Sequence, residues 1–252
     1  MSTALACELE RQVVEAWPAA QCEELDGWLL RASGGPTHRG NSVAALAAGA
    51  RFSLPARIER MEDWYAERGQ VAMVQLGPCS QPTELDAVLE QRGYGRRGES
   101  VVTLAATAQV IEASRCELAA RVEERAGPDW LGIVAGSSRH ASTKEIFHGF
   151  LARLGARCCF VTAWVDDQPA TVCLGISSPG RLGVYAMHTV PELRRRGAAR
   201  AALHALASHA LRQGYPELYL LVEAQNAPAR ALYAQSGFAD VYRYHYRIQG
   251  GA

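Results

Sequence analysis

The stretch VPELRRRGAAR, residues 190–200, largely decides which fold and chemistry this chain is expected to have. It lies between an apolar segment typical of a strand, residues 183–190, and a helical spacing of apolar residues that begins at Ala199. Pro191 ends the strand, and Gly197 allows a left-handed or closely approached backbone. The free N–H groups at the start of the helix, together with four arginines, predict a cradle for a diphosphate. A solvated basic turn that caps the helix is the alternative.

Outward from this stretch, the second half of the chain alternates strands and helices, as an α/β or α+β sheet domain does. We expect a helix from Ala199 that ends before Gly214. Strands are expected at residues 160–165, 170–176, 183–190 and 218–222. A strand, a helix and a strand joined by short loops predict a right-handed crossover between parallel strands. In such sheets a ligand binds at the carboxyl ends of the strands.

The first half follows the same plan more weakly. Its expected strands are residues 27–31, 42–46, 71–76 and 100–105, and its expected helices are residues 58–68 and 82–91. The segment AVLEQRGY at 87–94 aligns with ALYAQSGF at 231–238, which is 144 residues later and suggests a tandem repeat. A chance match of a helix followed by glycine and an aromatic residue is the alternative. We place two domains at residues 1–108 and 109–252.

Composition limits the classes of protein that this chain can represent. With 252 residues, 48% of them apolar, it can fill a core of its own, and 26 basic against 26 acidic residues argue against nucleic acid as a partner. No stretch approaches the roughly 18 apolar residues of a membrane span. The seven cysteines include no C-x-x-C pair, which argues against a disulfide framework and a zinc site and favours the cytoplasm. They are Cys7, Cys22, Cys79, Cys116, Cys158, Cys159 and Cys173.

Two motifs resemble those of the GNAT superfamily of N-acetyltransferases. Arg194-x-x-Gly197-x-Ala199, after the strand end MHTVP at 187–191, resembles motif A, where members bind the pyrophosphate of acetyl-CoA. The segment NAPARALYAQSGF at 226–238 resembles the second signature, N-x-x-A-x-x-L-Y-x-x-x-G-F. The resemblance covers about residues 160–248, and the first half resembles the degenerate repeat of tandem members. It implies a mixed α+β fold with two GNAT-like domains, each a mixed central sheet flanked by helices, of which the second is complete.

The resemblance also implies how the cofactor is held. Acetyl-CoA would be the cosubstrate, with no metal, and backbone amides of residues 195–199 would hold its diphosphate. Backbone groups of Met187 and Thr189 would hold the acetyl carbonyl and the pantetheine, and Asn226 would contact the pantetheine arm or cap the following helix. The residues assigned to the cofactor are therefore Met187, Thr189, Arg194, Arg195, Arg196, Gly197, Ala198, Ala199, Arg200, Asn226 and Tyr233.

Three residues are candidates for catalysis. The resemblance makes Tyr233 the general acid that meets the departing thiolate, while a core aromatic beside Phe238 is the alternative. Its counterpart in the first half is Leu89, which donates nothing, so we expect that half to be catalytically silent. Glu223, just after a strand, and His188, within one, are the candidates for the base. Either has a structural alternative, as a solvated carboxylate or a core histidine.

We therefore expect transfer of an acetyl group from acetyl-CoA to an amine of a small molecule or peptide, by direct attack in a ternary complex. A non-catalytic acyl-CoA sensor or an interaction module is the alternative. The expected state is a monomer or homodimer without nucleic-acid or membrane partners, and the first half is expected to act as a scaffold and a wall for the acceptor. The acceptor is expected to meet residues 109–155 and 242–246, including Trp130, Arg139, Glu145, Phe147 and His148.

Overall fold

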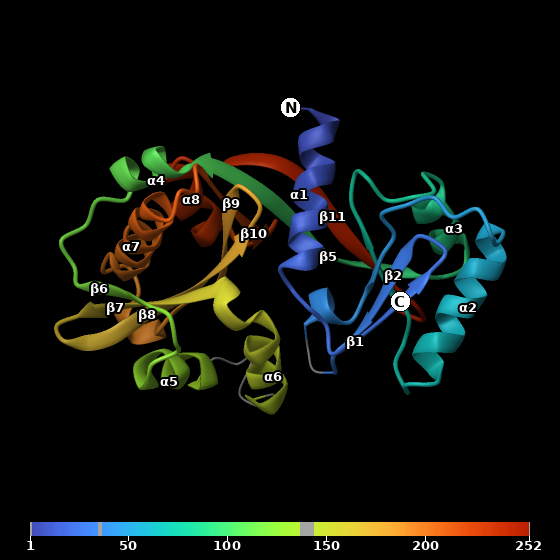
Figure 1. Cartoon of the computed structure of the whole chain (residues 1–252), viewed down its shortest axis with the longest axis horizontal. Helices are drawn as coiled ribbons and strands as arrows, with labels where there is room; N and C mark the ends of the chain where they lie inside the picture. Colours follow the sequence, from blue (N-terminus) through green and yellow to red (C-terminus); the bar gives the residue numbers. More distant parts are fainter. Residues whose placement is uncertain (1, 35–36, 137–143, 252) are drawn as a thin grey trace. The chain divides into compact units, whose positions relative to one another are not determined.

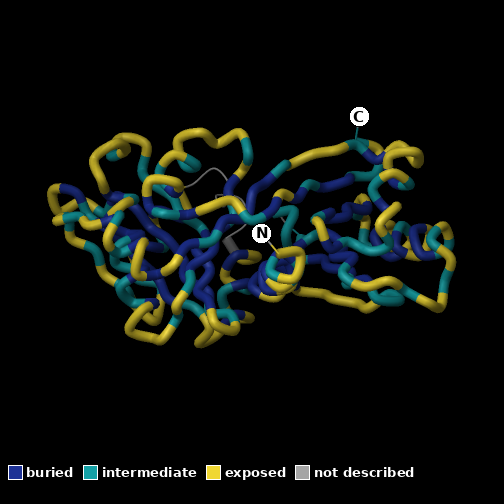
Figure 2. Tube along the Cα trace, turned by 90° about the horizontal axis from the view of Figure 1, so that it is seen from above, coloured by how far each residue is buried: buried dark blue, intermediate teal, exposed yellow. Residues whose placement is uncertain are grey.

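A computed structural model describes residues 2–34, 37–136 and 144–251 of the chain. The chain divides into two compact units, Met1–Val101 with Tyr242–Ala252, and Val102–Val241. The elements of both are labelled in Figure 1. Figure 2 shows the buried residues concentrated along the inner segments and the exposed ones on the turns.

The first unit is built on a mixed sheet and has its own core. Its strands lie in the order β1-β2-β3-β4-β11-β5. Strands β3 and β4 are parallel, whereas the pairs β1–β2, β2–β3 and β4–β11 are antiparallel. Trp28, Tyr65 and Leu89 are among the buried side chains that fill the core. Its elements are α1 (Thr3–Glu15), β1 (Gln21–Leu25), β2 (Trp28–Ala32), η1 (His38–Gly40), β3 (Val43–Ala44), α2 (Leu54–Ala66), β4 (Met73–Leu76), α3 (Leu85–Gln91), residues 95–101 of β5 (Gly95–Ala106) and residues 242–248 of β11 (Ala239–Ile248).

The second unit has the strand order β5-β10-β9-β8-β7-β6. Strands β6 to β9 pair antiparallel, and β9 pairs parallel with β10, which confirms the predicted parallel pair joined through α7. Besides residues 102–106 of β5, its elements are α4 (Thr107–Ala113), β6 (Ala120–Glu123), α5 (Pro128–Gly136), α6 (Lys144–Leu154), η2 (Gly155–Arg157), β7 (Cys158–Val165), β8 (Gln168–Ser178), β9 (Arg181–Thr189), η3 (Pro191–Leu193), α7 (Ala198–Arg212), β10 (Glu217–Glu223) and α8 (Ala227–Gln235).

The two units share one order of elements. In each, a strand, a helix, a parallel strand and a second helix follow one another, as β3-α2-β4-α3 and as β9-α7-β10-α8. A left-handed glycine follows the end of each long helix: Gly69, with φ +63°, comes three residues after the last residue of α2, and Gly214, with φ +81°, comes two residues after the last residue of α7. At both ends the glycine N–H bonds the carbonyl three residues back, at 2.9 and 3.0 Å. These shared features favour a repeated unit over a chance match.

Several sequence-based expectations need correction or extension. Helix α2 begins at Leu54 rather than residue 58, because Pro55 is well suited to a first helical turn. The sequence patterns do not predict the helix α1 or the strand β1. The predicted division at residues 108 and 109 stays a prediction; the compact units differ from it in that the last eleven residues, Tyr242–Ala252, group with the first unit.

One pair of cysteines forms a disulfide, although the cysteine spacing predicted no disulfide framework. Cys7 of α1 and Cys79, after β4, form a disulfide with their Cα atoms 5.4 Å apart. They are 72 residues apart in sequence, and spacing alone does not show which distant cysteines the fold brings together. Within the described ranges, no helix is long and apolar enough to cross a membrane.

Candidate active site

The parallel strands β9 and β10 separate toward their carboxyl ends. Their register runs from Arg181 opposite Glu217 to Val184 opposite Leu220, and in the described residues it ends there. Strand β9 nevertheless continues to Thr189 and β10 to Glu223. The two carboxyl ends therefore do not pair with each other. This is the opening at which a ligand is expected in a parallel sheet.

A bulge in β9 changes which side chains share a face of the sheet. Val172 of β8 lies opposite His188, but Leu174, two residues on, lies opposite Tyr185, three residues back. The extra residue is accommodated where Ala186 adopts a left-handed φ of +47°. In a regular strand the side chains of Tyr185 and Thr189 would lie on the same face of the sheet. Because of the bulge, Tyr185 shares a face with His188 instead.

The end of β9 is held by the loop that follows it. The Thr189 hydroxyl lies 2.8 Å from that of Thr171, and the Val190 N–H donates to the Ala170 carbonyl at 2.9 Å. Arg194 folds back so that its Nε donates to the carbonyl oxygen of Thr189 at 3.3 Å. Arg194, which was predicted to contact the diphosphate, thus contacts the backbone of Thr189, which was predicted to contact the pantetheine.

The loop before α7 has the backbone of an anion cradle. Arg195 has φ +62° and Gly197 has φ +90°, and α7 begins directly after them. The first turn of the helix closes where the Ala201 N–H donates to the Gly197 carbonyl at 3.0 Å. Among the described residues, no side chain accepts a hydrogen bond from the amides of residues 195–199. Open amides at the positive end of a fifteen-residue helix fit a diphosphate.

Arginines give this cradle its charge. Arg194, Arg195, Arg196 and Arg200 are placed in and just after the loop, and Arg195, Arg196 and Arg200 are exposed. Arg196 is turned toward the β7–β8 turn, where its Nη2 forms an ion pair with the Asp166 carboxylate at 2.5 Å. Exposed arginines that are ordered by weak or solvent-screened contacts can reorient toward a phosphate at small cost.

Asn226 begins α8 as its N-cap. Its Oδ1 accepts a hydrogen bond from the Ala229 N–H at 3.2 Å, so the capping role expected from the sequence is present. Its predicted contact with pantetheine stays a prediction. Of the two candidate bases, Glu223 is exposed at the end of β10 and His188 is half-buried in β9.

Tyr233 is both a packed aromatic and a lining residue of a pocket. It is 7% exposed, and its ring lies 5.9 Å from that of Phe238. Burial, with a smaller effect from Cys173, raises the pKa of its phenol well above the usual value. The phenol therefore keeps its proton and is suited to donate a hydrogen bond. The pocket measures about 340 Å³ and is lined by Thr103, Val222, Ala224, Ala227, Arg230, Ala231, Tyr233, Ala234, Phe238 and Asp240.

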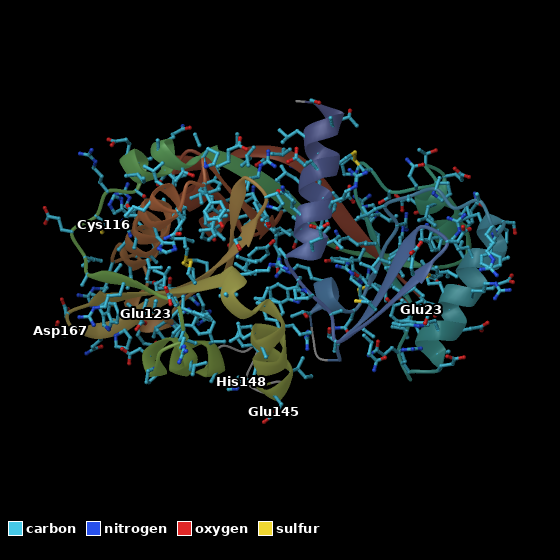
Figure 3. The ribbon with its side chains drawn as sticks, viewed as in Figure 1. Glu23, Cys116, Glu123, Glu145, His148 and Asp167 are labelled. Atoms are coloured by element: carbon cyan, nitrogen blue, oxygen red, sulfur yellow. A yellow bond between two sulfur atoms is a disulfide. The ribbon has the colours of Figure 1, made fainter. Side chains whose placement is uncertain are left out.

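Some residues expected to face the acceptor lie in the core instead. Trp130 is fully buried, donates from Nε1 to the Cys173 carbonyl at 3.0 Å, and stacks on Phe147, which is itself buried. The fully buried Trp130 therefore does not face an acceptor, whereas the place of Phe147 in an acceptor wall stays a prediction. Glu145 and His148 are labelled on α6 in Figure 3, and Glu145 is exposed. Arg139 lies outside the described residues.

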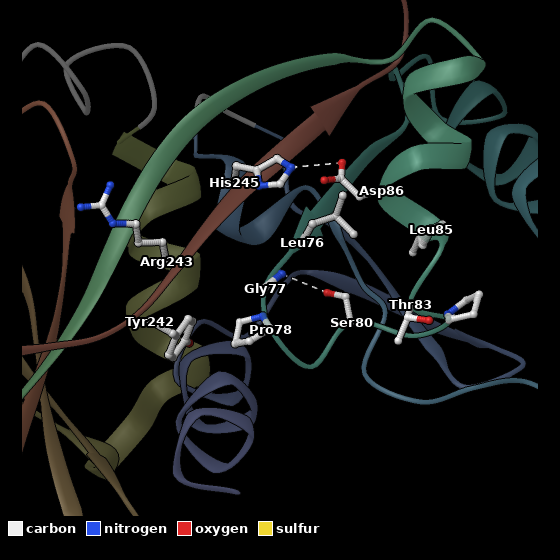
Figure 4. Close-up of a pocket in the computed structure, with 11 residues that line it drawn as sticks. Leu76, Gly77, Pro78, Ser80, Thr83, Leu85, Asp86, Tyr242, Arg243 and His245 are labelled. Atoms are coloured by element: carbon white, nitrogen blue, oxygen red, sulfur yellow. Dashed lines mark hydrogen bonds and ion pairs between the residues drawn. The ribbon is translucent and has the colours of Figure 1, made fainter. Parts of the chain in front are cut away.

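A second pocket, for which no sequence pattern provides a signal, belongs to the first unit (Figure 4). It measures about 350 Å³, and on one wall the His245 Nε2 lies 3.2 Å from the Asp86 carboxylate. Partial burial acts to raise the pKa of Asp86, but hydrogen bonds from Arg247 and His245 lower it overall. Burial lowers the pKa of His245. Asp86 and His245 are far apart in the sequence, so only the fold brings them together.

Comparison with known proteins identifies the family. Residues 3–247 match the family described as "Probable histone acetyltransferase Rv0428c C-terminal". The chain belongs to this family of acetyltransferases. It is therefore a member of the GNAT superfamily, as its two motifs indicated.

Two of the proteins similar to this GNAT protein match it along nearly its whole length, and a third matches most of it. The uncharacterized N-acetyltransferase YobR of Bacillus subtilis is 26% identical over 253 residues, which covers 96% of this chain and 98% of YobR. A GCN5-related N-acetyltransferase from Kribbella flavida superimposes with a TM-score of 0.71 at 14% identity, over 100% of this chain and 98% of that one. A tandem GNAT protein from the clavulanic acid biosynthesis pathway gives a TM-score of 0.61 at 12% identity, over 79% and 70% of the two chains. The structural matches show a shared fold.

Proposed function

We propose that this GNAT protein transfers an acetyl group from acetyl-CoA to an amine, and that the second unit carries the reaction. The observation that carries the proposal is the opening between β9 and β10 beside a loop of open amides and exposed arginines. These features stand where the two sequence motifs place the cofactor. The acceptor would be an amine of a small molecule or a peptide.

The loop before α7 would hold the diphosphate of acetyl-CoA. Amides of residues 195–199 lie at the positive end of α7, and the exposed arginines add charge. The left-handed Gly197 matters most, because a Cβ there would strain the backbone. The nearest atoms to such a Cβ would be Leu118 Cδ1 at 3.5 Å and Cys116 Sγ at 3.7 Å, which are ordinary van der Waals contacts, so the cost lies in the backbone conformation and not in a clash.

The bulge in β9 would present backbone groups to the acetyl end of the cofactor. Acetyl-CoA supplies a thioester whose carbonyl carbon accepts the amine. The bulge at Ala186 interrupts the pairing of β9 with β8, so Met187 has no partner in the register of these two strands. Its backbone polar groups can therefore face the opening. A fixed N–H at this place would stabilise negative charge that develops on the carbonyl oxygen.

Tyr233 would meet the thiol that leaves. A phenol with a raised pKa is a poor acid but a good hydrogen-bond donor, and burial strengthens such a bond. Glu223 or His188 would take the proton of the amine, directly or through water. We favour Glu223, since a side chain just beyond the end of a strand reaches a site at that edge most readily.

The test is release of free thiol from acetyl-CoA with a panel of amines, amino acids, polyamines, aminoglycosides and peptides. We expect at least one class to accelerate thiol release and to gain the mass of one acetyl group. A protein that binds acetyl-CoA but acetylates none of these classes would instead be a sensor. We further propose that the protein acts in the cytoplasm as a monomer or homodimer.

A further inference from the structure

A tight turn in the first unit places a carboxylate against the loop between β3 and α2. Asp26 and Gly27 join β1 to β2 with φ values of +47° and +86°. A Cβ at Gly27 would lie 2.9 Å from the Ala47 carbonyl oxygen, so the turn sits directly against the loop. The Asp26 side chain thereby reaches residues 50–52.

Three consecutive backbone amides bind this carboxylate. Ala50 N–H donates to Oδ1 at 3.0 Å, and Phe52 N–H donates to Oδ2 at 3.0 Å. Between them, Arg51 N lies 3.1 Å from Oδ1 and 3.2 Å from Oδ2. Successive amides that converge on one anion make a binding concavity of the kind that holds phosphates. The concavity opens just before the thirteen-residue helix α2.

A buried arginine adds positive charge to the same place. Arg57 is 3% exposed, and its Nη2 lies 3.3 Å from the Asp26 carboxylate. Within the described part of the chain, its Nε and Nη1 are buried and have no hydrogen-bond partner. The guanidinium also packs over the Trp28 ring, 4.9 Å from the ring centroid, and it carries two donors that the carboxylate does not satisfy. A phosphate, with more oxygens, matches such a donor set better.

The charge on Asp26 agrees with this arrangement. Burial acts to raise the pKa of the carboxyl, but the N–H groups of Phe52, Arg51 and Ala50 and the charge on Arg57 lower it overall. Asp26 is thus held as an anion. In the loop before α2, the Asp26 carboxylate therefore acts as an anionic ligand of the backbone amides of residues 50–52.

The second unit has the same turn, but its acid binds elsewhere. Asp166 and Asp167 join β7 to β8 with φ values of +49° and +60°. Asp166 forms an ion pair with the Arg196 side chain, and the amides of the loop before α7 donate to no side chain among the described residues. The turn at Asp26 therefore places a carboxylate in the loop before α2. The turn at Asp166 places none in the loop before α7.

We propose that the loop at residues 49–52, with Arg57, is an anion-binding cradle whose permanent ligand is the carboxylate of Asp26. Asp26 replaces a phosphate there, so the first unit takes up no phosphate-bearing cofactor. Given the proposed function of the second unit, on which this consequence rests, the chain binds one acetyl-CoA. The first unit is silent because its cradle is already occupied.

The test removes the internal ligand and offers inorganic pyrophosphate. Asp26→Gly suits the left-handed turn and deletes the carboxylate, and Gly197→Glu in the same chain blocks the second cradle. We expect the double variant to bind pyrophosphate at least about tenfold more tightly than Gly197→Glu alone, by calorimetry at matched ionic strength. Adding Arg57→Met should remove the gain. The matched control, Asp166→Gly with Gly197→Glu, should show none.

Equal pyrophosphate affinity with and without Asp26 would overturn the proposal, as would an equal gain in the Asp166→Gly control. If Asp26→Gly does not fold, Asp26→Asn keeps the turn and replaces the anionic ligand by a neutral, weaker one that pyrophosphate can displace. In the Gly197→Glu background, pyrophosphate should then raise the melting temperature more with Asp26→Asn than without it. An equal rise in the two proteins would also overturn the proposal. In the wild type, two acetyl-CoA molecules per chain would contradict it. No acetyl-CoA binding at all would contradict only the proposed function, because the pyrophosphate result does not depend on it.

Discussion

The ends of α3 and α8 have the same backbone and different chemistry. After α3, Gly93 has φ +82° and the Tyr94 N–H donates to the Leu89 carbonyl at 3.0 Å. After α8, Gly237 has φ +92° and the Phe238 N–H donates to the Tyr233 carbonyl, also at 3.0 Å. Yet Leu89 is fully buried in the core of the first unit, whereas Tyr233 lines a pocket. The two units share this helix end, and one side chain in it distinguishes a packing position from a candidate catalytic one.

The loops that precede α2 and α7 differ in the same way. Both come between parallel strands, but the first is filled by Asp26 and the second is open. The two units together indicate that a cradle of backbone amides is a property of the fold. Whether it is available to a ligand depends on one nearby side chain.

The largest effect should come from a change at the open cradle. Gly197→Glu places a carboxylate beside the predicted diphosphate site and strains a residue with φ +90°. We expect it to abolish the rise in melting temperature that acetyl-CoA produces in the wild type. Thermal unfolding with and without acetyl-CoA measures this.

The matched change in the first unit is Gly49→Ala, since a Cβ at Gly49 would collide with the Asp26 carboxylate. It should lower the melting temperature and leave the acetyl-CoA shift intact. A normal shift in folded Gly197→Glu would place the cofactor elsewhere.

The paired helix ends supply the next test. Tyr233→Phe should reduce kcat by at least about tenfold with acetyl-CoA affinity near that of the wild type, because the hydroxyl matters only as the thiol leaves. Leu89→Met, at the equivalent position, should leave kcat unchanged and cost less than about 1.5 kcal/mol of stability. Steady-state kinetics and calorimetry separate the two quantities. Parallel losses of affinity and kcat would make Tyr233 a packing residue.

A smaller, pH-dependent effect should distinguish the two candidate bases. Loss of the base should reduce the rate several-fold at neutral pH and much less at high pH, where the amine is already neutral. We expect this profile for Glu223→Gln and a wild-type profile for His188→Ala, each measured with a confirmed acceptor. Wild-type profiles in both variants would assign proton removal to another group or to water.

The smallest effect should be on acid stability. The folded-state pKa of Asp26 is lowered, so its contribution to stability is present above the ordinary aspartate pKa and is lost as pH falls through the folded-state value. Asp26→Asn should therefore lower the melting temperature at neutral pH, and its difference from the wild type should shrink below about pH 4. A difference that is constant across this range would show that Asp26 does not act through its charge.

The sequence predicted well what local chemistry determines. Gly197 and Gly214 each stand at a left-handed residue next to a helix, as expected, and the parallel pairing of β9 with β10 follows from short connections. It predicted poorly what depends on distant pairing. The bulge at Ala186, the Cys7–Cys79 disulfide and the contacts of Asp26 join segments whose meeting only the fold decides. Trp130 shows the same limit, because an aromatic residue on a short helix has no local sign of which way it faces.

The last strand also constrains how the chain is made. Strand β11 follows α8, but its residues 242–248 belong to the first unit, where residues 245–248 pair with β4, as in Ile248 opposite Met73. During synthesis the first unit emerges long before this strand does, so β4 must wait with an unpaired edge until β11 has been made. Removing residues 242–248 would therefore damage the unit that contains α1. A chaperone that binds exposed strand edges would therefore have to stay bound longest to the first unit, which is synthesised first.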